Sequence, residues 1–161
     1  MEYLIGTYYL KMDAKNRVAI PSALKQQLPG EGKDPLVISR GLGDFLVIYT
    51  KKDWRKKLDG LMELSEYSLE HQEFVRHFTN GATEVTPDTA FRLLFPKFLT
   101  DHAGIDHKDA SDVVLNCVLN RVEVWEQKAY DAKMSAKYDL SGQAQKLMVK
   151  PATGAGRRDD D

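Results

Sequence analysis

Two segments of the chain place an aspartate and an arginine at the same spacing. Residues 13–21 read Asp-Ala-Lys-Asn-Arg-Val-Ala-Ile-Pro, and residues 88–96 read Asp-Thr-Ala-Phe-Arg-Leu-Leu-Phe-Pro. Each copy therefore reads Asp, three residues, Arg, three apolar residues and Pro. The repeat indicates a duplicated structural unit, and its charged pair is the best candidate for chemistry in the chain.

The first copy could use its charged pair in two ways, and the residues alone favour neither. Asp13 and Arg17 can face each other across a tight turn, as a salt bridge or capping interaction that only shapes the turn. Alternatively, Asp13 orients Lys15 and Arg17 toward phosphates or base edges, because the planar arginine fork suits both targets. Strand alternation would put Lys11 on the same face, which predicts a basic strand pair able to enter a major groove.

The second copy is less basic. Ala90 stands where the first copy has Lys15, so Arg92 is the only cation within the second motif. Acidic Glu84 and Asp88 flank Arg92, which favours a structural role for this arginine or weaker binding by this face.

Other chemistry has little support in the sequence. There is no G-x-S-x-G, P-loop, G-x-G-x-x-G or H-E-x-x-H motif. The histidines are not paired at metal-ligand spacing; they are His71, His77, His102 and His107. Cys117 lies in an apolar run and is interpreted as a structural thiol. The sequence thus predicts no catalytic residue, no metal, no cofactor and no small-molecule substrate.

Composition indicates a globular chain outside the membrane. Hydrophobic residues make up 42% of the 161 residues and charged residues 29%. No apolar run approaches the length that crosses a bilayer, no secretory signal is recognisable, and one cysteine cannot form an internal disulfide, so a cytoplasmic protein is expected. Residues 1–58 hold 11 Lys and Arg against 6 Asp and Glu, a basic excess within a chain of net charge −1.

The repeat continues on both sides of each motif. Each unit is predicted as strand, turn, strand, short helix, strand, hairpin turn, strand and helix. Gly43 and Asn120 are expected to supply positive φ in the two hairpin turns. Matched aromatic residues are interpreted as packing residues; they are Tyr49 with Trp54 in the first copy and Trp125 with Tyr130 in the second.

The domain boundaries follow from this repeat. Ser68 is a plausible N-cap for a helix over residues 69–79, which Asn80-Gly81 would end. Because each unit is too short to bury enough surface alone, the two copies are expected to pack as a pseudo-dimer with one core. The expected divisions are a first module at 7–54, a helical linker at 55–82, a second module at 83–128, a C-terminal helical segment at 129–149 and a disordered tail at 150–161.

These motifs resemble those of the MraZ family. Residues 6–21 are similar to the first signature of that family, residues 88–96 to the second, and residues 120–125 (Asn-Arg-Val-Glu-Val-Trp) to its closing strand motif. The resemblance covers about residues 1–145 in order and spacing.

The resemblance implies a fold and a function. It implies an α+β, β-rich chain with two tandem AbrB-like swapped-hairpin modules packed as an intramolecular pseudo-dimer with flanking helices. It further implies a homo-oligomeric ring that binds double-stranded DNA at direct repeats in the promoter of its own division and cell-wall operon, and hence a nucleoid-associated protein. The implied residues are Lys11, Lys15, Arg17 and Arg92 for DNA binding, with Asp13, Asn16 and Asp88 shaping the motifs.

One departure from the family pattern concerns the turns. The family usually has glycine just before each motif arginine, whereas this chain has Asn16 and Phe91. Asparagine tolerates the left-handed conformation, so the first turn is expected to be preserved. Phenylalanine tolerates it poorly, so the second turn is expected to have altered geometry.

Two other function classes differ in how well they fit the sequence. AbrB-like folds also occur in antitoxins and other protein-interaction modules, although those usually carry one module and a disordered toxin-binding tail. An enzyme is disfavoured because the sequence supplies no nucleophile, metal site or cofactor loop.

Overall fold

The computed structural model describes residues 2–106 and 110–149, and its elements follow the predicted repeat. The tail predicted for residues 150–161 lies outside the described residues. The strands are β1 (Thr7–Met12), β2 (Arg17–Ala19), β3 (Leu36–Arg40), β4 (Leu46–Thr50), β5 (Thr83–Val85), β6 (Arg92–Leu94), β7 (Ser111–Val118) and β8 (Arg121–Glu126). The helices are α1 (Ser22–Lys25), the 3₁₀ helix η1 (Pro29–Gly32), α2 (Lys51–Met62), α3 (Leu69–Thr79), α4 (Lys97–His102), α5 (Gln127–Ser135) and α6 (Leu140–Met148).

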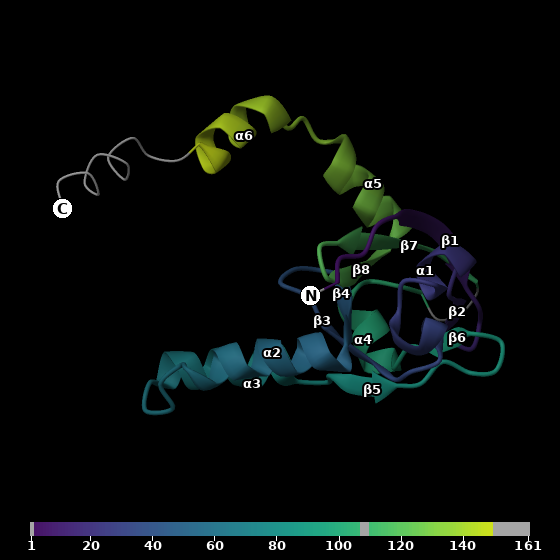
Figure 1. The fold of residues 1–161 in the computed structure, drawn as a ribbon, viewed down its shortest axis with the longest axis horizontal. Coiled ribbons are helices and arrows are strands. Elements are labelled where there is room, and N and C mark those ends of the chain that lie inside the picture. The colour runs from purple at the N-terminus through teal and green to yellow at the C-terminus, as the bar shows by residue number, and fades with distance from the viewer. Residues whose placement is uncertain (1, 107–109, 150–161) are drawn as a thin grey trace. The chain divides into compact units, whose positions relative to one another are not determined.

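The two copies exchange their first strands, as expected for swapped hairpins. One antiparallel sheet has the order β1-β7-β8-β4-β3-β5, so β1 of the first copy pairs with β7 of the second, and β5 of the second pairs with β3 of the first. A separate ribbon pairs β2 with β6, again one strand from each copy (Figure 1). The predicted fold class, an α+β chain of two intertwined β modules, is therefore confirmed.

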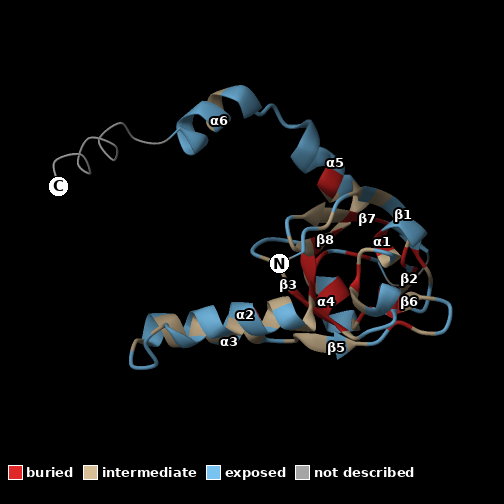
Figure 2. Ribbon diagram, viewed as in Figure 1, coloured by how far each residue is buried: buried red, intermediate tan, exposed pale blue. Residues whose placement is uncertain are grey.

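One hydrophobic core serves both copies. Burial is concentrated in the strands and in α4, as Figure 2 shows, because both sheets turn alternate apolar side chains toward the same interior. Val18 of β2 and Leu93 of β6 lie opposite each other in the ribbon and are both buried. Strands of both copies line this core, so each copy depends on the other to bury its apolar residues.

The helices α2 and α3 form a pair that lies side by side in Figure 1. Ser68 caps α3 by accepting a hydrogen bond from the His71 N–H at 3.3 Å, so the predicted cap and the predicted range of this helix are confirmed. Only Phe78 of this helix is buried, and α2 has no buried residue. The pair therefore has mostly exposed and half-buried side chains (Figure 2).

The hairpin turns differ from the prediction. Positive φ falls on Leu119 (φ 57°) and not on Asn120, while Gly43 has no positive φ. Val118, the last residue of β7, pairs with Arg121, the first residue of β8, and a two-residue connection can take its left-handed residue at the first position. The expectation for Gly43 and Asn120 was wrong because turn type depends on strand register, which the sequence does not reveal.

The matched aromatic residues pack in corresponding places. The ring centroids of Tyr49 and Trp54 are 5.4 Å apart, and those of Trp125 and Tyr130 are 5.9 Å apart in an edge-on arrangement. The interpretation of these residues as packing residues is confirmed.

The chain divides after Tyr130 into two units. The second contains the end of α5 and then α6, whose N-cap Asp139 accepts a hydrogen bond from the Gly142 N–H at 3.0 Å. This short helix was not separately predicted.

Candidate nucleic-acid interface

The first motif forms a tight turn built around the Asp13 carboxylate. Its Oδ1 accepts hydrogen bonds from the backbone N–H groups of Lys15 and Arg17, each at 2.9 Å. Its Oδ2 accepts the Nε–H of Arg17, also at 2.9 Å. The Asn16 N–H closes the turn on the Asp13 carbonyl at 3.0 Å, with Asn16 left-handed at φ 63°. One carboxylate therefore holds both the loop backbone and the arginine side chain.

These bonds also set the ionisation of Asp13. The Arg17 backbone N–H, helped by the Arg17 side chain and the Lys15 N–H, holds the pKa of the Asp13 carboxyl below its ordinary value of 3.8. The Arg17 bond uses Nε and leaves the terminal nitrogens of its fork without a hydrogen-bond partner among residues 2–106 and 110–149. The salt bridge therefore shapes the turn, as one alternative predicted, and it also fixes the position of the Arg17 side chain. A role of Arg17 in contacting phosphates or bases stays a prediction.

The second motif repeats the first bond for bond. Asp88 accepts the N–H groups of Ala90 and Arg92 on Oδ1 and the Arg92 Nε–H on Oδ2, each at 2.9 Å. Phe91 is left-handed at φ 60°, so the expectation of an altered second turn was wrong. The Arg92 backbone N–H likewise holds the pKa of the Asp88 carboxyl below 3.8.

Two contacts hold Phe91 in its unfavourable conformation. Its carbonyl accepts the Ile20 N–H at 2.9 Å, and the Lys25 ammonium lies 3.9 Å from the centre of its ring. The first turn has the matching backbone bond, from the Phe95 N–H to the Asn16 carbonyl at 2.8 Å. Each turn is therefore anchored to the residue that directly follows the short strand of the other copy, and this overrides the poor tolerance of phenylalanine for positive φ.

The β2–β6 ribbon brings both arginines onto one face. Arg17 lies opposite Leu94, and Ala19 opposite Arg92. Directly opposite residues of an antiparallel pair share a face, so these four side chains lie together on the face opposite to the buried Val18. The Arg17 side chain is 28% exposed and that of Arg92 37%. This shared face was not predicted, because it depends on the pairing of strands that lie far apart in the sequence.

The lysines fall in different surroundings. Lys15 is exposed at the tip of the first turn and has no ion pair within the described residues. Lys11 lies on β1 in the six-stranded sheet, and its ammonium pairs with Asp112 of β7 at 2.6 Å. The predicted basic strand pair of Lys11 and Arg17 was wrong, because β1 pairs with β7 and β2 pairs with β6 in a separate ribbon. Of the two lysines, only Lys15 lies at the arginine turn.

One cation near the turn was missed. Lys97 begins α4 and lines a surface hollow of about 620 Å³ together with Lys15 and Asn16. It also pairs with Asp101 at 3.1 Å. The repeat offered no signal for it, because the residue after the motif proline is Ser22 in the first copy.

The described residues give little support to metal binding or to a reactive cysteine. Over residues 2–106 and 110–149, no three side chains of His, Cys, Asp and Glu come together as possible metal ligands. Burial raises the pKa of the half-buried Cys117 thiol, which favours the unreactive form. His107 lies outside the described residues. No helix in the described ranges has both the length and the apolar composition needed to cross a bilayer.

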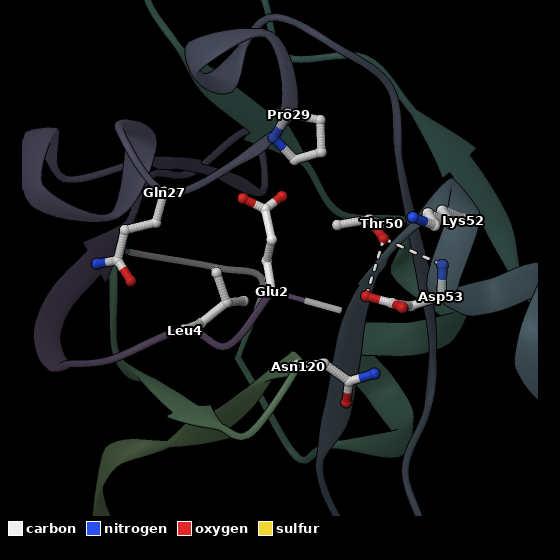
Figure 3. A pocket seen from close by; sticks show the side chains of 8 residues that line it. All are labelled: Glu2, Leu4, Gln27, Pro29, Thr50, Lys52, Asp53 and Asn120. Atoms are coloured by element: carbon white, nitrogen blue, oxygen red, sulfur yellow. Dashed lines mark hydrogen bonds between the residues drawn. The ribbon is translucent and has the colours of Figure 1, made fainter.

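A small hollow beside the N-terminal segment does not offer a site either. It measures about 90 Å³, and the Glu2 side chain lies in the middle of it in Figure 3. Its wall includes Asp53, whose Oδ2 accepts the Thr50 hydroxyl at 3.1 Å. The Glu2 side chain narrows this hollow, and about 90 Å³ is below the volume of ordinary small-ligand sites.

Comparison with protein families identifies relatives of this architecture. Residues 3–76 and 78–149 match the family described as "MraZ protein, putative antitoxin-like" in two successive segments, one for each copy. A Christiangramia forsetii protein named Transcriptional regulator MraZ is 36% identical over 137 residues, which span 84% of this chain and 86% of that protein. A protein of the same name from Clostridium beijerinckii is 34% identical over 89% of this chain and 95% of its own length.

Proposed function

The chain belongs to the MraZ family, and on that premise we propose that it is a sequence-specific DNA-binding regulator of transcription rather than an enzyme. The names of its relatives support a regulator. The observation that carries DNA binding is the exposed face of the β2–β6 ribbon, where Arg17 and Arg92 lie together. A two-stranded ribbon fits a major groove, and arginine forks suit guanine edges and phosphates.

We assign each residue of this site a separate role in DNA binding. Arg17, whose terminal nitrogens stay available, makes the base or phosphate contact, and Lys15 adds a phosphate contact beside it. Asp13 and Asp88 orient the two arginines, and Asn16 supplies the left-handed turn residue. Arg92 contributes more weakly because its turn lacks a second cation. Lys11 strengthens the basic field only at longer range, since Asp112 pairs with it.

The proposal extends to assembly and target. Several copies joined head to tail in a homo-oligomeric ring would present identical ribbons in the same sense, which suits direct repeats better than a palindrome. Weak contacts of single ribbons would then combine through effective concentration. The target is the promoter of the division and cell-wall operon that contains the chain's own gene, which makes this a protein of the cytoplasm and nucleoid.

A gel-shift titration tests the proposal. The DNA upstream of the chain's own gene is titrated at two salt concentrations with the wild type and with Arg17→Ala. We expect salt-sensitive binding that Arg17→Ala abolishes, a loss of more than about tenfold, while the oligomer seen by size-exclusion chromatography stays intact. Lys33→Ala is the control, because it removes another exposed cation without an ion pair in the described residues. Unchanged binding by Arg17→Ala would show that the site is misassigned.

A second candidate is a protein-interaction role, because the family description includes the words antitoxin-like. Co-purification of a small protein partner in equal amount, with no shift of the upstream DNA by the wild type, would favour it.

A further inference from the structure

The first half of α2 is strongly basic, and the proposed DNA contact does not use it. Five cations lie within seven residues; they are Lys51, Lys52, Arg55, Lys56 and Lys57. Lys51 pairs with Glu84 at 3.3 Å, whereas the other four have no ion pair within the described residues. Clustered cations repel one another, so this surface is suited to an anion.

One face of this helix borders a hollow of about 300 Å³. The lining residues come from α2, the end of β4 and the β7–β8 turn; they are Tyr49, Asp53, Lys56, Lys57, Gly60, Asn120 and Arg121. The α2 members follow a spacing of three and four residues, which puts them on a single helix face. The volume lies at the lower end of the range for small-ligand sites.

The lining is cationic and rich in donors. Lys56, Lys57 and Arg121 contribute three positive charges, and Asp53 one negative charge. The Asp53 carboxylate already has a partner, because its Oδ2 accepts the Thr50 hydroxyl (Figure 3). The Lys57 ammonium lies 6.0 Å from the ring centre of Tyr49.

The remaining groups suit the same kind of ligand. Burial raises the pKa of the Tyr49 hydroxyl, against the opposing effect of the Arg121 charge, so the phenol stays protonated as a possible donor. The Asn120 amide adds further donors.

A glycine keeps this hollow open. Gly60 lies in the interior of α2, where glycine weakens a helix relative to other residues. A Cβ built at this position meets no atom within 4 Å, so close packing does not require the glycine. Its φ is not positive either, so backbone conformation does not require it. The absence of a side chain leaves room beside the cations.

We propose that this hollow binds a phosphate group, carried either by a free phosphorylated small molecule or by the DNA backbone. Arg121 and Lys57 neutralise the anion from two elements, Lys56 adds a third charge, and Asn120 donates hydrogen bonds. The site is separate from the arginine turns, and its occupancy does not depend on the proposed use of Arg17.

Calorimetric titration of the full chain with inorganic pyrophosphate tests the site. Three variants are compared with the wild type: Lys57→Gln with Arg121→Gln, the charge-matched control Lys52→Gln with Arg55→Gln, and Gly60→Leu. We expect at least about tenfold weaker binding in the first, and a change within about twofold in the control. Gly60→Leu should also lose binding by filling the hollow, although leucine favours the helix and so preserves folding.

The salt dependence of duplex affinity for the same proteins identifies the source of the phosphate. If Lys57→Gln with Arg121→Gln loses pyrophosphate binding but keeps the salt slope of duplex affinity, the site binds a free phosphorylated ligand. A slope reduced by about one to two in Lys57→Gln with Arg121→Gln, but not in the control, supports the DNA backbone. The proposal is overturned if pyrophosphate does not bind and the slopes agree, or if the charge-matched control loses as much as the Lys57 and Arg121 variant.

Discussion

The two aspartate–arginine turns share a geometry but not a charge. Each aspartate accepts two backbone N–H groups and one arginine Nε–H at 2.9 Å. The third residue is exposed lysine in the first turn and exposed alanine in the second, and the left-handed residue is Asn16 in one and Phe91 in the other. The two turns therefore keep one geometry, held by the aspartate, the arginine and the cross-copy backbone bonds, although the residues between aspartate and arginine differ in charge.

The difference in charge predicts that the first turn contacts DNA and that the second turn has a mainly structural role. The first turn combines a fixed arginine with an unpaired lysine, as a phosphate and base contact would need. The second retains the fixed arginine and adds an anchor for α1 through the Lys25 contact with Phe91. Exchange of residues between the turns can separate these duties, because the backbone framework is the same.

Exchange of the lysine and alanine at positions 15 and 90 should have the largest effect of the exchanges, on DNA affinity. Lys15→Ala is expected to weaken binding to the upstream DNA by about fivefold and to lower the salt slope by about one, since one phosphate contact is lost. Ala90→Lys should raise affinity and slope by similar amounts, because the second turn can hold a lysine in the same position. Gel-shift titrations at several salt concentrations measure both.

The charge exchange has a built-in control. The double variant Lys15→Ala with Ala90→Lys keeps the net charge of the chain and should bind with intermediate affinity. Equal affinity of all three variants and the wild type would mean that neither turn tip touches DNA.

Exchange of the left-handed residue should have a smaller effect, on stability. Phe91→Asn relieves strain of about 1 kcal/mol, because asparagine tolerates positive φ better, but it removes the ring contact with Lys25, worth about 0.5–1 kcal/mol. We expect little net change in the wild type and a gain of about 1 kcal/mol in a Lys25→Met background, measured by urea unfolding. Destabilisation in both backgrounds would refute this account of how Phe91 is held.

The elements were predictable from local sequence, and their pairing was not. The repeat predicted the order of strands and helices, and the Ser68 cap predicted α3, because caps and periodicity act within a few residues. The hairpin turn at Leu119 and the altered turn at Phe91 were mispredicted, because strand register and cross-copy hydrogen bonds decided both conformations. The swapped strands came only from the family resemblance.

In the candidate site, contacts within one motif were predictable from the sequence and contacts between the copies were not. The spacing of Asp13 and Arg17 predicted a contact between them, since four residues span a tight turn. The pairing of Lys11 with Asp112 and the shared face of Arg17 and Arg92 join residues of different copies. Such arrangements depend on the tertiary fold, so spacing within one motif carries no information about them.

The smallest expected effect is a pH dependence that both turns share equally. In each turn a backbone N–H of the arginine lowers the pKa of the aspartate below 3.8. The unfolded chain, with the ordinary pKa, therefore binds more protons in this acid range, and folding stability rises with pH there. The contribution is complete above pH 5 or so and is lost as pH falls through the lowered native pKa values.

Urea unfolding between pH 6 and pH 3 measures this contribution. Asp13→Asn and Asp88→Asn should each flatten the acid part of the stability curve by a similar amount, and the double variant should flatten it by their sum, because the turns share no side chain. Asparagine can still accept the backbone N–H groups, which separates loss of charge from loss of the turn. A larger effect of Asp13→Asn than of Asp88→Asn would break the equivalence of the two frameworks, and an unchanged curve in the double variant would remove these carboxylates as the cause.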